Sequence, residues 1–354
     1  SATASVFASD SWTPVPELTL TAAGRYNLTQ VDNRLLVRAA DGNVQLHELR
    51  VFNKNLDRYV LTQTLTEESF RYTSFNPSVG ANWQARPDLH VFGNLSRGAR
   101  TPSVVELGCA FDDTPTPYVP GRPELGSTAR SLVGPGCNLP TTLSGDPHLP
   151  QIRALSGELG ARGPVWGGWE WNASIYRTDL RDDIYFVGVG DGRSYFDTID
   201  KTRRQGMELG LKGTLGPLAV KFGYTYTDAT FQSEFYTVSS HNSSADFNQN
   251  SRSAGDRYVL GQRLLPSPTA ALNKGYGTYR MIHVMPGARM PGIAAHAFNL
   301  NLRWQIAPQW DLGLAMQARS KSFVRGNENN RHQPGGTDQE TGLYYCSVAS
   351  CDSQ

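Results

Sequence analysis

The chain of 354 residues contains no run of about 18 apolar residues, so no transmembrane helix is expected. It also has no excess of charge of one sign, because its formal net charge is +1, and it has no basic stripe that would attract nucleic acid. Hydrophobic residues make up only 39% of the chain. That low fraction does not exclude a membrane protein, because only alternate residues of a transmembrane β-strand face lipid.

Cysteine is scarce, and its four residues fall into two local pairs, Cys109 with Cys137 and Cys346 with Cys351, each within one expected loop. An even number of loop cysteines favours disulfide bonds formed in an oxidising compartment, with free thiols as the alternative. Their spacing does not match the paired Cys-x-x-Cys pattern of a zinc site.

Apolar and polar residues alternate with a period of two along much of the chain, which predicts β-strands rather than helices. In one such segment Leu300, Leu302 and Trp304 fall on one face, while Asn301 and Arg303 fall on the other. Each segment runs to roughly ten residues or more, which suits a tilted strand that spans a bilayer. The clear segments are 18–29, 72–85, 203–214, 218–229, 296–306 and 310–320, and weaker ones are 89–98, 152–162 and 169–178.

The connections between these segments alternate between short and long. The short ones all contain proline, at positions 87, 164, 217 and 308. The expected long loops span 31–70, 99–150, 179–202, 230–295 and 321–354, and Gly188–Gly192 is best explained as the tip of an outer hairpin. This sorting predicts a transmembrane barrel, whose periplasmic turns are short and whose extracellular loops are long.

The tryptophans give an independent indication of the same architecture. All of them lie in or near a short connection, if Trp12 is assigned to the Pro14–Pro16 turn. Trp favours the boundary between membrane and water, so one level of Trp predicts an aromatic girdle on the periplasmic side. The alternative is the core of a sandwich, in which Trp would be scattered along the strands. The girdle candidates are Trp83, Trp166, Trp169, Trp171, Trp304 and Trp310.

Taken together, these patterns predict an all-β, antiparallel, up-and-down transmembrane barrel. Its apolar strand faces meet lipid, and its polar faces line a wide, wet lumen, since a narrow barrel would fill its interior with side chains.

Several short motifs occur along the chain, namely Phe75–Gly80, Ser96–Leu107, Asp182–Ile184 followed by Lys201–Leu209, Met290–His296 and Phe323–Asn330. Each motif alone is of low specificity, but together they cover residues from about 18 to 335. In this order they resemble motifs in the barrel of TonB-dependent outer-membrane receptors.

This resemblance implies a receptor in the outer membrane of a Gram-negative bacterium, and neither an enzyme nor a cofactor-binding protein. Its partners would be outer-membrane lipid, a bulky ligand such as a ferric siderophore, and the TonB energy-coupling complex, reached through an N-terminal plug. The family also takes up cobalamin, haem, sugars and peptides. The alternatives are a passive porin-like channel and a surface-binding outer-membrane protein.

Two features of the family pattern are not found in this sequence. No plug precedes the first strand, and no final strand ends in an aromatic residue. About nine spans are visible, with one more ending near Trp12, whereas outer-membrane transporters of this type have 22 strands. Residues 1–354 are therefore expected to form one domain that is roughly half of a barrel.

The ligand is expected at the loops and the mouth, where aromatic and arginine side chains suit a bulky anionic molecule. One of Arg203 and Arg204 should face the lumen, either to attract an anionic chelate or, as we favour, to form an ion pair with Glu208 or with the plug. Packing between loops is the alternative role for the loop residues. The loop candidates are Phe111, Tyr118, Arg122, Tyr236, Tyr258 and Arg325.

Three acidic residues, Asp179, Asp182 and Asp183, lie where a strand enters an expected loop. A metal site or an acid–base pair would need convergent ligands, so a solvated turn is the preferred interpretation.

We predict that this chain, expressed alone, does not form a closed functional barrel, because an open sheet in lipid leaves backbone groups without partners. The measurement is extraction from membranes followed by electrophoresis with and without heating. Recovery of a heat-modifiable, protease-resistant species would contradict the prediction.

Overall fold

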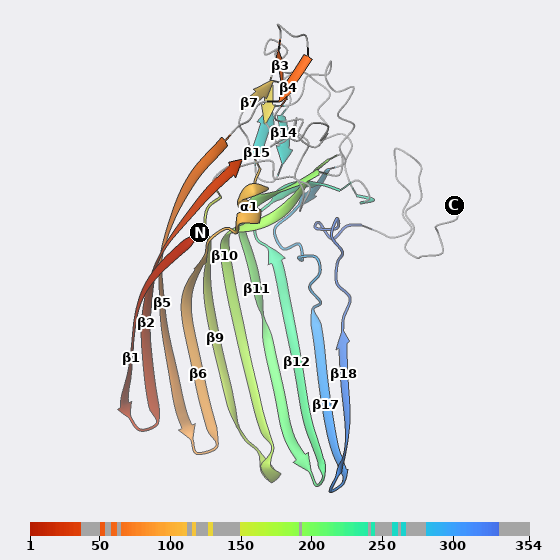
Figure 1. The fold of residues 1–354 in the computed structure, drawn as a ribbon. Coiled ribbons are helices and arrows are strands. Elements are labelled where there is room, and N and C mark those ends of the chain that lie inside the picture. Colours follow the sequence, from red (N-terminus) through yellow and green to blue (C-terminus); the bar gives the residue numbers. More distant parts are fainter. Residues whose placement is uncertain are drawn as a thin grey trace, which may run out of the picture.

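The computed structural model describes residues 1–36, 50–53, 58–61, 65–111, 115–117, 127–129, 149–190, 193–239, 242–244, 257–260, 263–266 and 281–332. Its main feature is one open, antiparallel sheet of ten strands (Figure 1). The strand order is β1-β2-β5-β6-β9-β10-β11-β12-β17-β18, so each long strand pairs with the next long strand along the chain. Among the described residues, no helix is long and apolar enough to cross a membrane.

The strands of the sheet differ greatly in length. Four of them are much longer than the roughly ten residues that a tilted bilayer span requires, namely β2, β5, β10 and β11. Their bounds are β1 Ala2–Val15, β2 Leu18–Leu36, β5 Leu65–Arg86, β6 Leu89–Arg100, β9 Ile152–Pro164, β10 Glu170–Gly190, β11 Arg193–Leu215, β12 Leu218–Phe231, β17 His296–Ala307 and β18 Trp310–Arg319. These strands are therefore longer than a bilayer span needs.

One end of the sheet carries the short turns, as the proline pattern predicts (Figure 1). The β11–β12 turn consists of Gly216 and Pro217, and Gly216 has a φ of 57°, a conformation that glycine adopts without steric cost. The connection from β9 to β10 contains a short 3-10 helix, η3 (Trp166–Gly168). We call this end of the sheet the short-turn end and the opposite end the long-loop end.

The tryptophans gather at the short-turn end. Trp166 and Trp310 are largely exposed, at 87% and 72%, and Trp12, Trp83 and Trp304 are about half exposed. The ring of Trp169 lies so close to Gly213 that a Cβ there would approach it to 2.3 Å, so this glycine makes room for the indole. Exposed indoles at one level of the sheet fit the girdle interpretation, which stays a prediction about the membrane.

The long-loop end carries the smaller elements (Figure 1). Short hairpins form between β3 and β4, β7 and β8, β13 and β16, and β14 and β15. The bounds are β3 Arg50–Asn53, β4 Arg58–Leu61, α1 Val104–Gly108, β7 Pro115–Pro117, β8 Ser127–Ala129, β13 Phe235–Val238, β14 Arg257–Leu260, β15 Arg263–Pro266 and β16 Met281–Val284.

One expected loop is wrong. Residues 179–202 do not form a long loop, because β10 and β11 continue as a paired ladder up to the Gly190–Arg193 pair. Strand β2 likewise continues to Leu36 and β5 begins at Leu65, inside the expected loop 31–70. In these stretches polar residues interrupt the alternation that predicts contact with lipid. The strands nevertheless remain paired through their backbones, because pairing in water does not require that alternation. The ladder ends at the pair of Gly190 and Arg193, and the residues predicted at the hairpin tip, Asp191 and Gly192, lie outside the described residues.

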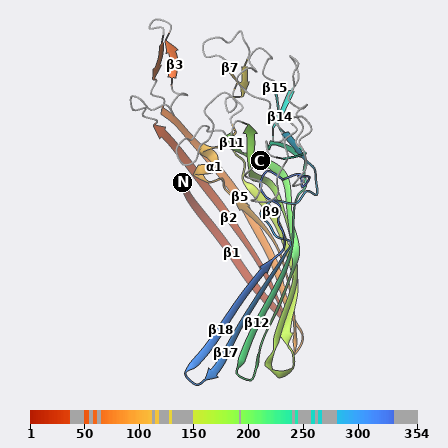
Figure 2. The same ribbon diagram turned by 90° about the vertical axis from the view of Figure 1, so that its right-hand side faces the viewer.

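The sheet has no apolar core of its own. Its outward face exposes large apolar side chains such as Leu159, Ile175 and Leu314, which are 55%, 59% and 59% exposed. Its concave face carries the polar partners of the alternation, such as Asn27 and Thr225. Figure 2 shows the strands running obliquely across a curved sheet. The buried apolar clusters lie instead at the long-loop end.

A charge on the outward face should destabilise the assembled protein, whereas the same charge one residue away on the concave face should not. Leu300 faces outward beside Phe222 and Met316, and Asn299 faces inward beside Gly223, where an added Cβ meets nothing within 4 Å. We expect Leu300→Arg to lower the free energy of unfolding by about 2–4 kcal/mol and Asn299→Arg by under about 1 kcal/mol. The measurement is urea unfolding of the full-length protein in lipid vesicles. Equal losses in the two variants would contradict the assignment of faces.

Candidate functional site at the long-loop end

The extended parts of β10 and β11 curve across the long-loop end and form the floor on which other segments pack (Figure 1). The hairpin of β13 and β16 lies against β10, with the backbone N–H of Gly188 donating to the Thr237 hydroxyl oxygen at 3.0 Å. A Cβ at Gly188 would lie 2.7 Å from the Val238 carbonyl oxygen, so glycine permits this close approach.

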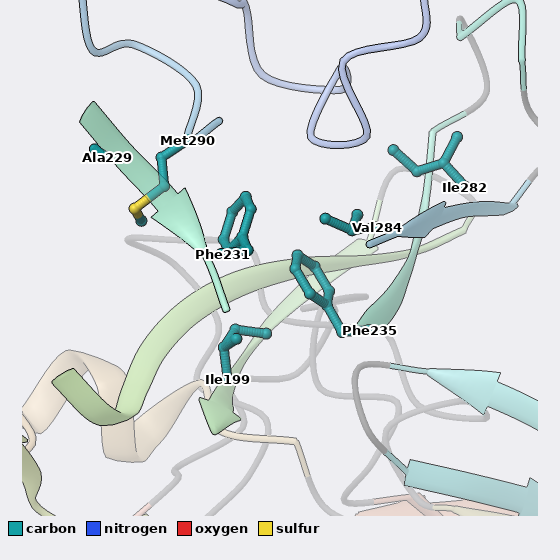
Figure 3. Close-up of a cluster of buried hydrophobic side chains, with 7 residues drawn as sticks. All are labelled: Ile199, Ala229, Phe231, Phe235, Ile282, Val284 and Met290. Carbon is teal, nitrogen blue, oxygen red and sulfur yellow. The ribbon is translucent and has the colours of Figure 1, made fainter. Parts of the chain in front are cut away.

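A buried apolar cluster, which we call the Phe231 cluster, joins these segments (Figure 3). Its aromatic centre is Phe231 on β12 and Phe235 on β13, whose ring centroids lie 4.9 Å apart, with Tyr185 of β10 edge-on to Phe231 at 5.4 Å. The full set is Ile199, Ala229, Phe231, Phe235, Ile282, Val284 and Met290. Burial of this cluster outside the barrel wall stabilises the loops, because each fully buried large side chain contributes about 1.5–3 kcal/mol.

A second cluster forms around helix α1, which follows β6. Ser103 caps the helix, since its hydroxyl accepts the Glu106 backbone N–H at 3.2 Å while the Glu106 carboxylate accepts the Ser103 N–H at 2.7 Å. Burial opposes ionisation of Glu106, but the hydrogen bonds from Arg100 and Ser103 outweigh it, so its pKa lies below the ordinary value. The helix then buries Leu107 against Val31, Tyr72, Ala110 and Leu149.

A buried polar turn, residues 326–332, ties the remaining loops together. The Asn242 side-chain amide donates to the Gly326 carbonyl at 2.8 Å and to the Asn329 side chain at 3.1 Å. The Asn330 amide donates to the Arg289 carbonyl at 3.0 Å. Asn327, Glu328 and Asn329 are themselves buried. Three segments that lie far apart in the sequence are thereby held in one geometry.

Arg325 connects this turn to Tyr185 and Phe186 of β10. Its guanidinium donates to the Phe186 carbonyl at 2.8 Å and lies over the rings of Phe186 and Tyr185, at 5.0 Å and 5.6 Å from their centroids. The Tyr185 hydroxyl donates to the Glu328 carboxylate at 3.2 Å. Burial and the neighbouring Glu328 raise the pKa of Tyr185 above its ordinary value.

Charges on the concave face are paired near the same level. The Arg204 guanidinium lies 3.2 Å from the Asp183 carboxylate, which also accepts the Thr202 hydroxyl at 2.6 Å. Asp182 has a φ of 55°, and this kink turns Asp183 away from the outer face, where alternation after Arg181 would place it. Asp183 is buried, so this carboxylate is not part of a solvated turn.

Lower on the concave face, a polar depression of about 400 Å³ lies across β1, β2, β5 and the end of β6. It is lined by Arg25, Asn27, Ser74, Asn76 and Thr101, among others. The Asn76 Oδ1 atom is buried there and has no hydrogen-bond partner among the described residues. Such a wall can bind polar groups of a ligand or of another protein segment, but it holds no arrangement of acid, base and nucleophile.

Residues 1–340 match the family model described as "TonB dependent receptor-like, beta-barrel". The chain belongs to the TonB-dependent receptor family. Members of this family are transport receptors of the Gram-negative outer membrane and not enzymes. No protein with a curated functional description matches the chain in sequence.

Solved structures share the fold of this receptor barrel. The copper transporter OprC matches with a TM-score of 0.54 and 11% identity, over 92% of this chain and 36% of that one. The ferric yersiniabactin uptake receptor FyuA from Yersinia pestis matches with a TM-score of 0.51 and 9% identity, over 93% and 36%. The siderophore receptor PiuA from Acinetobacter baumannii matches with a TM-score of 0.50 and 12% identity, over 90% and 33%. The receptor barrel thus spans about a third of the length of the solved structures it matches.

The predicted ligand residues are not gathered in one place. Arg204 faces the lumen, as expected of one of the two arginines, but its partner is Asp183 rather than Glu208. Arg203 lies on the outer face, paired with Asp179 at 2.7 Å. Phe111 is buried edge-on against Tyr195, which makes it a packing residue. Arg325 is exposed and lies against Tyr185 and Phe186 of β10.

The other candidates divide between described and undescribed parts of the chain. Tyr236 stacks on His283, with centroids 4.3 Å apart and an interplanar angle of 2°. Tyr258 lies in β14, whereas Tyr118 and Arg122 lie outside the described residues. Cys109 is disulfide-bonded. The remaining cysteines, Cys137, Cys346 and Cys351, also lie outside the described residues.

The sequence alone did not predict the buried polar turn or its partners Asn242, Tyr185 and Glu328. The Phe323–Asn330 motif marked its position, but the partners come from other loops and carry no local pattern. Among the described residues, no group of three His, Cys, Asp or Glu side chains could hold a metal ion.

Substitution of Asn330 should loosen the loops of the receptor in a graded way. Its φ of 59° is left-handed, and its side chain bonds Arg289. Asn330→Gly removes only the hydrogen bonds, whereas Asn330→Ala also strains the backbone by roughly 1–2 kcal/mol. We expect the rate of amide hydrogen exchange in residues 285–292 and 325–332 of the full-length protein to be lowest in the wild type. It should be higher in Asn330→Gly and highest in Asn330→Ala. Equal protection in all three proteins would show that the turn does not hold the loops.

Proposed function

We propose that this receptor barrel is part of an energy-coupled importer in the outer membrane of a Gram-negative bacterium. Its cargo would be a bulky nutrient, with a ferric siderophore as the leading class. One observation carries the proposal: a polar, open, curved sheet whose outer end is covered by loops folded into a packed cap.

The curvature of the sheet favours a wide barrel. Ten strands in sequence do not close on themselves, although smaller sets close in narrow barrels whose lumen is filled by side chains. A wide polar lumen passes solutes freely unless another element obstructs it. An N-terminal plug that interacts with the TonB complex would supply both the obstruction and the energy coupling.

The cap favours binding over simple diffusion. A porin-like channel needs only an open mouth, whereas here two buried apolar clusters and a buried polar turn hold the loops in one arrangement. Rigid loops bind with a smaller loss of conformational entropy than flexible ones. The exposed guanidinium of Arg325 and the stacked pair of Tyr236 and His283 lie on this cap, and they suit a ligand that is anionic and has flat apolar parts.

Uptake by a strain that lacks the full-length gene tests the proposal. With a panel of ferric siderophores, cobalamin, haem and sugars, we expect one ferric chelate to accumulate at least tenfold less in the deletion strain. Uptake should also stop when the inner-membrane proton gradient is collapsed, because TonB coupling draws on it.

The control is the same strain carrying the wild-type gene on a plasmid. Uptake that persists without the proton gradient would support a passive channel instead. Unchanged uptake of every compound, with cell-surface binding lost, would support a binding protein without transport.

A further inference from the structure

The concave wall formed by β1, β2 and β5 carries almost no charge. Its side chains are mostly serine, threonine and asparagine, and Arg25 is the one charged residue on this face along Thr3–Ser11, Thr19–Val31 and Tyr72–Gln84. Several cations elsewhere on the concave face lie beside carboxylates, as Lys212 does with Glu170 at 2.8 Å. Arg25 instead lies in a neutral polar wall, so an anion that neutralises it must come from outside this wall.

The Arg25 guanidinium is held in place by neutral groups. Its Nε atom donates to the Asn27 Oδ1 atom at 2.8 Å, and its Nη2 atom donates to the Ser5 hydroxyl oxygen at 3.0 Å. The Asn27 amide donates in turn to the Ser74 hydroxyl oxygen at 3.2 Å. Among the described residues, no carboxylate forms an ion pair with Arg25. A guanidinium has five N–H groups, so this network fixes its position and leaves N–H groups available to a ligand.

An unused acceptor lies next to this donor. The register places Asn76 of β5 directly opposite Arg25 of β2, and the Cβ atoms of such a pair lie about 4.5–5.5 Å apart. The Asn76 amide nitrogen donates to the Ser74 hydroxyl oxygen at 3.3 Å, but its Oδ1 atom is buried and has no partner in the part of the chain that the structure describes. A buried acceptor without a hydrogen bond is costly, so a ligand that donates to it would be stabilised.

The wall opens at this place because β5 separates from β6 (Figure 1). Their ladder ends at the pair of Ser78 and Ser96, and the next residue of β5 is Pro77, which has no backbone N–H. Beyond this pair β5 continues beside β2, while β6 continues beside β9. The polar depression of about 400 Å³ lies at this fork, and an added Cβ at Gly98 would meet nothing within 4 Å. Its volume is within the range of small-molecule sites.

We propose that this depression binds a carboxylate group that has an O–H or N–H donor on a neighbouring atom, as part of a cargo molecule that passes through the lumen. Arg25 binds the carboxylate, because a planar guanidinium forms two parallel hydrogen bonds with such a group. The Asn76 Oδ1 atom accepts the neighbouring donor. Phe7, which lies opposite Arg25 on β1 and is 73% exposed, offers an apolar contact beside the depression. The inference rests on the importer function proposed above and adds a binding position on the wall, below the cap.

The test measures the binding of malate and succinate to the full-length receptor, purified in a nonionic detergent, by titration calorimetry. The two probes differ only in one hydroxyl group beside a carboxylate. We expect the wild type to bind malate roughly fivefold more tightly than succinate, because only malate can donate to Asn76. Arg25→Gln should bind both probes on the order of tenfold more weakly, because it loses charge-assisted hydrogen bonds.

A second variant separates the two roles. Asn76→Ala should bind succinate like the wild type and show no preference for malate. The matched control is Lys221→Gln, which removes a cation from the concave face of β12 and should bind both probes like the wild type. Heat-modifiable migration in electrophoresis shows that the barrel of each variant is assembled.

Three results would overturn the proposal. Equal weakening by Arg25→Gln and Lys221→Gln would show a general effect of charge in the lumen. Equal binding of malate and succinate by the wild type would show that Asn76 accepts no donor from the ligand. Absence of binding of both probes would contradict the site itself, and a lower unfolding temperature of Arg25→Gln would then identify a carboxylate of the plug as the partner of Arg25.

Failure of this site and failure of the importer function give different results. If the wild type binds malate as expected but the deletion strain takes up every compound normally, the importer function is refuted and the carboxylate site is not. If uptake depends on the gene but the wild type binds neither probe, the site is refuted and the importer function is not.

Discussion

Backbone hydrogen bonding in an apolar layer is the constraint on which the rest of the molecule depends. Lipid offers no partners to N–H and C=O groups, so every strand that crosses it must pair with its neighbours. The up-and-down order from β1 to β18 meets this requirement with the shortest connections, since each long strand pairs with the next. Once pairing is fixed, alternation divides the side chains between lipid and lumen.

Above the membrane, water relaxes this constraint, and the strands behave differently. β10 and β11 continue far beyond a bilayer span, and they lose the apolar alternation while they keep their ladder. The Phe231 cluster and the α1 cluster then supply a conventional buried core. The receptor thus combines a wall that has apolar groups outside with a cap that has them inside.

The arginines show how a single step along a strand changes a residue's role. Arg204 points to the lumen and pairs with Asp183, whereas Arg203 points outward and pairs with Asp179. Two neighbouring arginines thus form ion pairs on opposite faces of one sheet, because successive side chains of a strand alternate between its faces.

The sequence by itself determined the strands of the wall, the short turns and the family. Period-two alternation and proline turns are local signals, and a lipid-facing strand such as β17 cannot satisfy its environment in any other way. Only the tertiary structure decided the extent of β10 and β11, the partner of Arg204 and the buried polar turn. These depend on contacts such as Asn242 with Asn329, which lie 87 residues apart and leave no periodic trace in the sequence. The outward row of Arg153, Arg181 and Lys201 is of the same kind, because it appears only when the register places β9, β10 and β11 side by side.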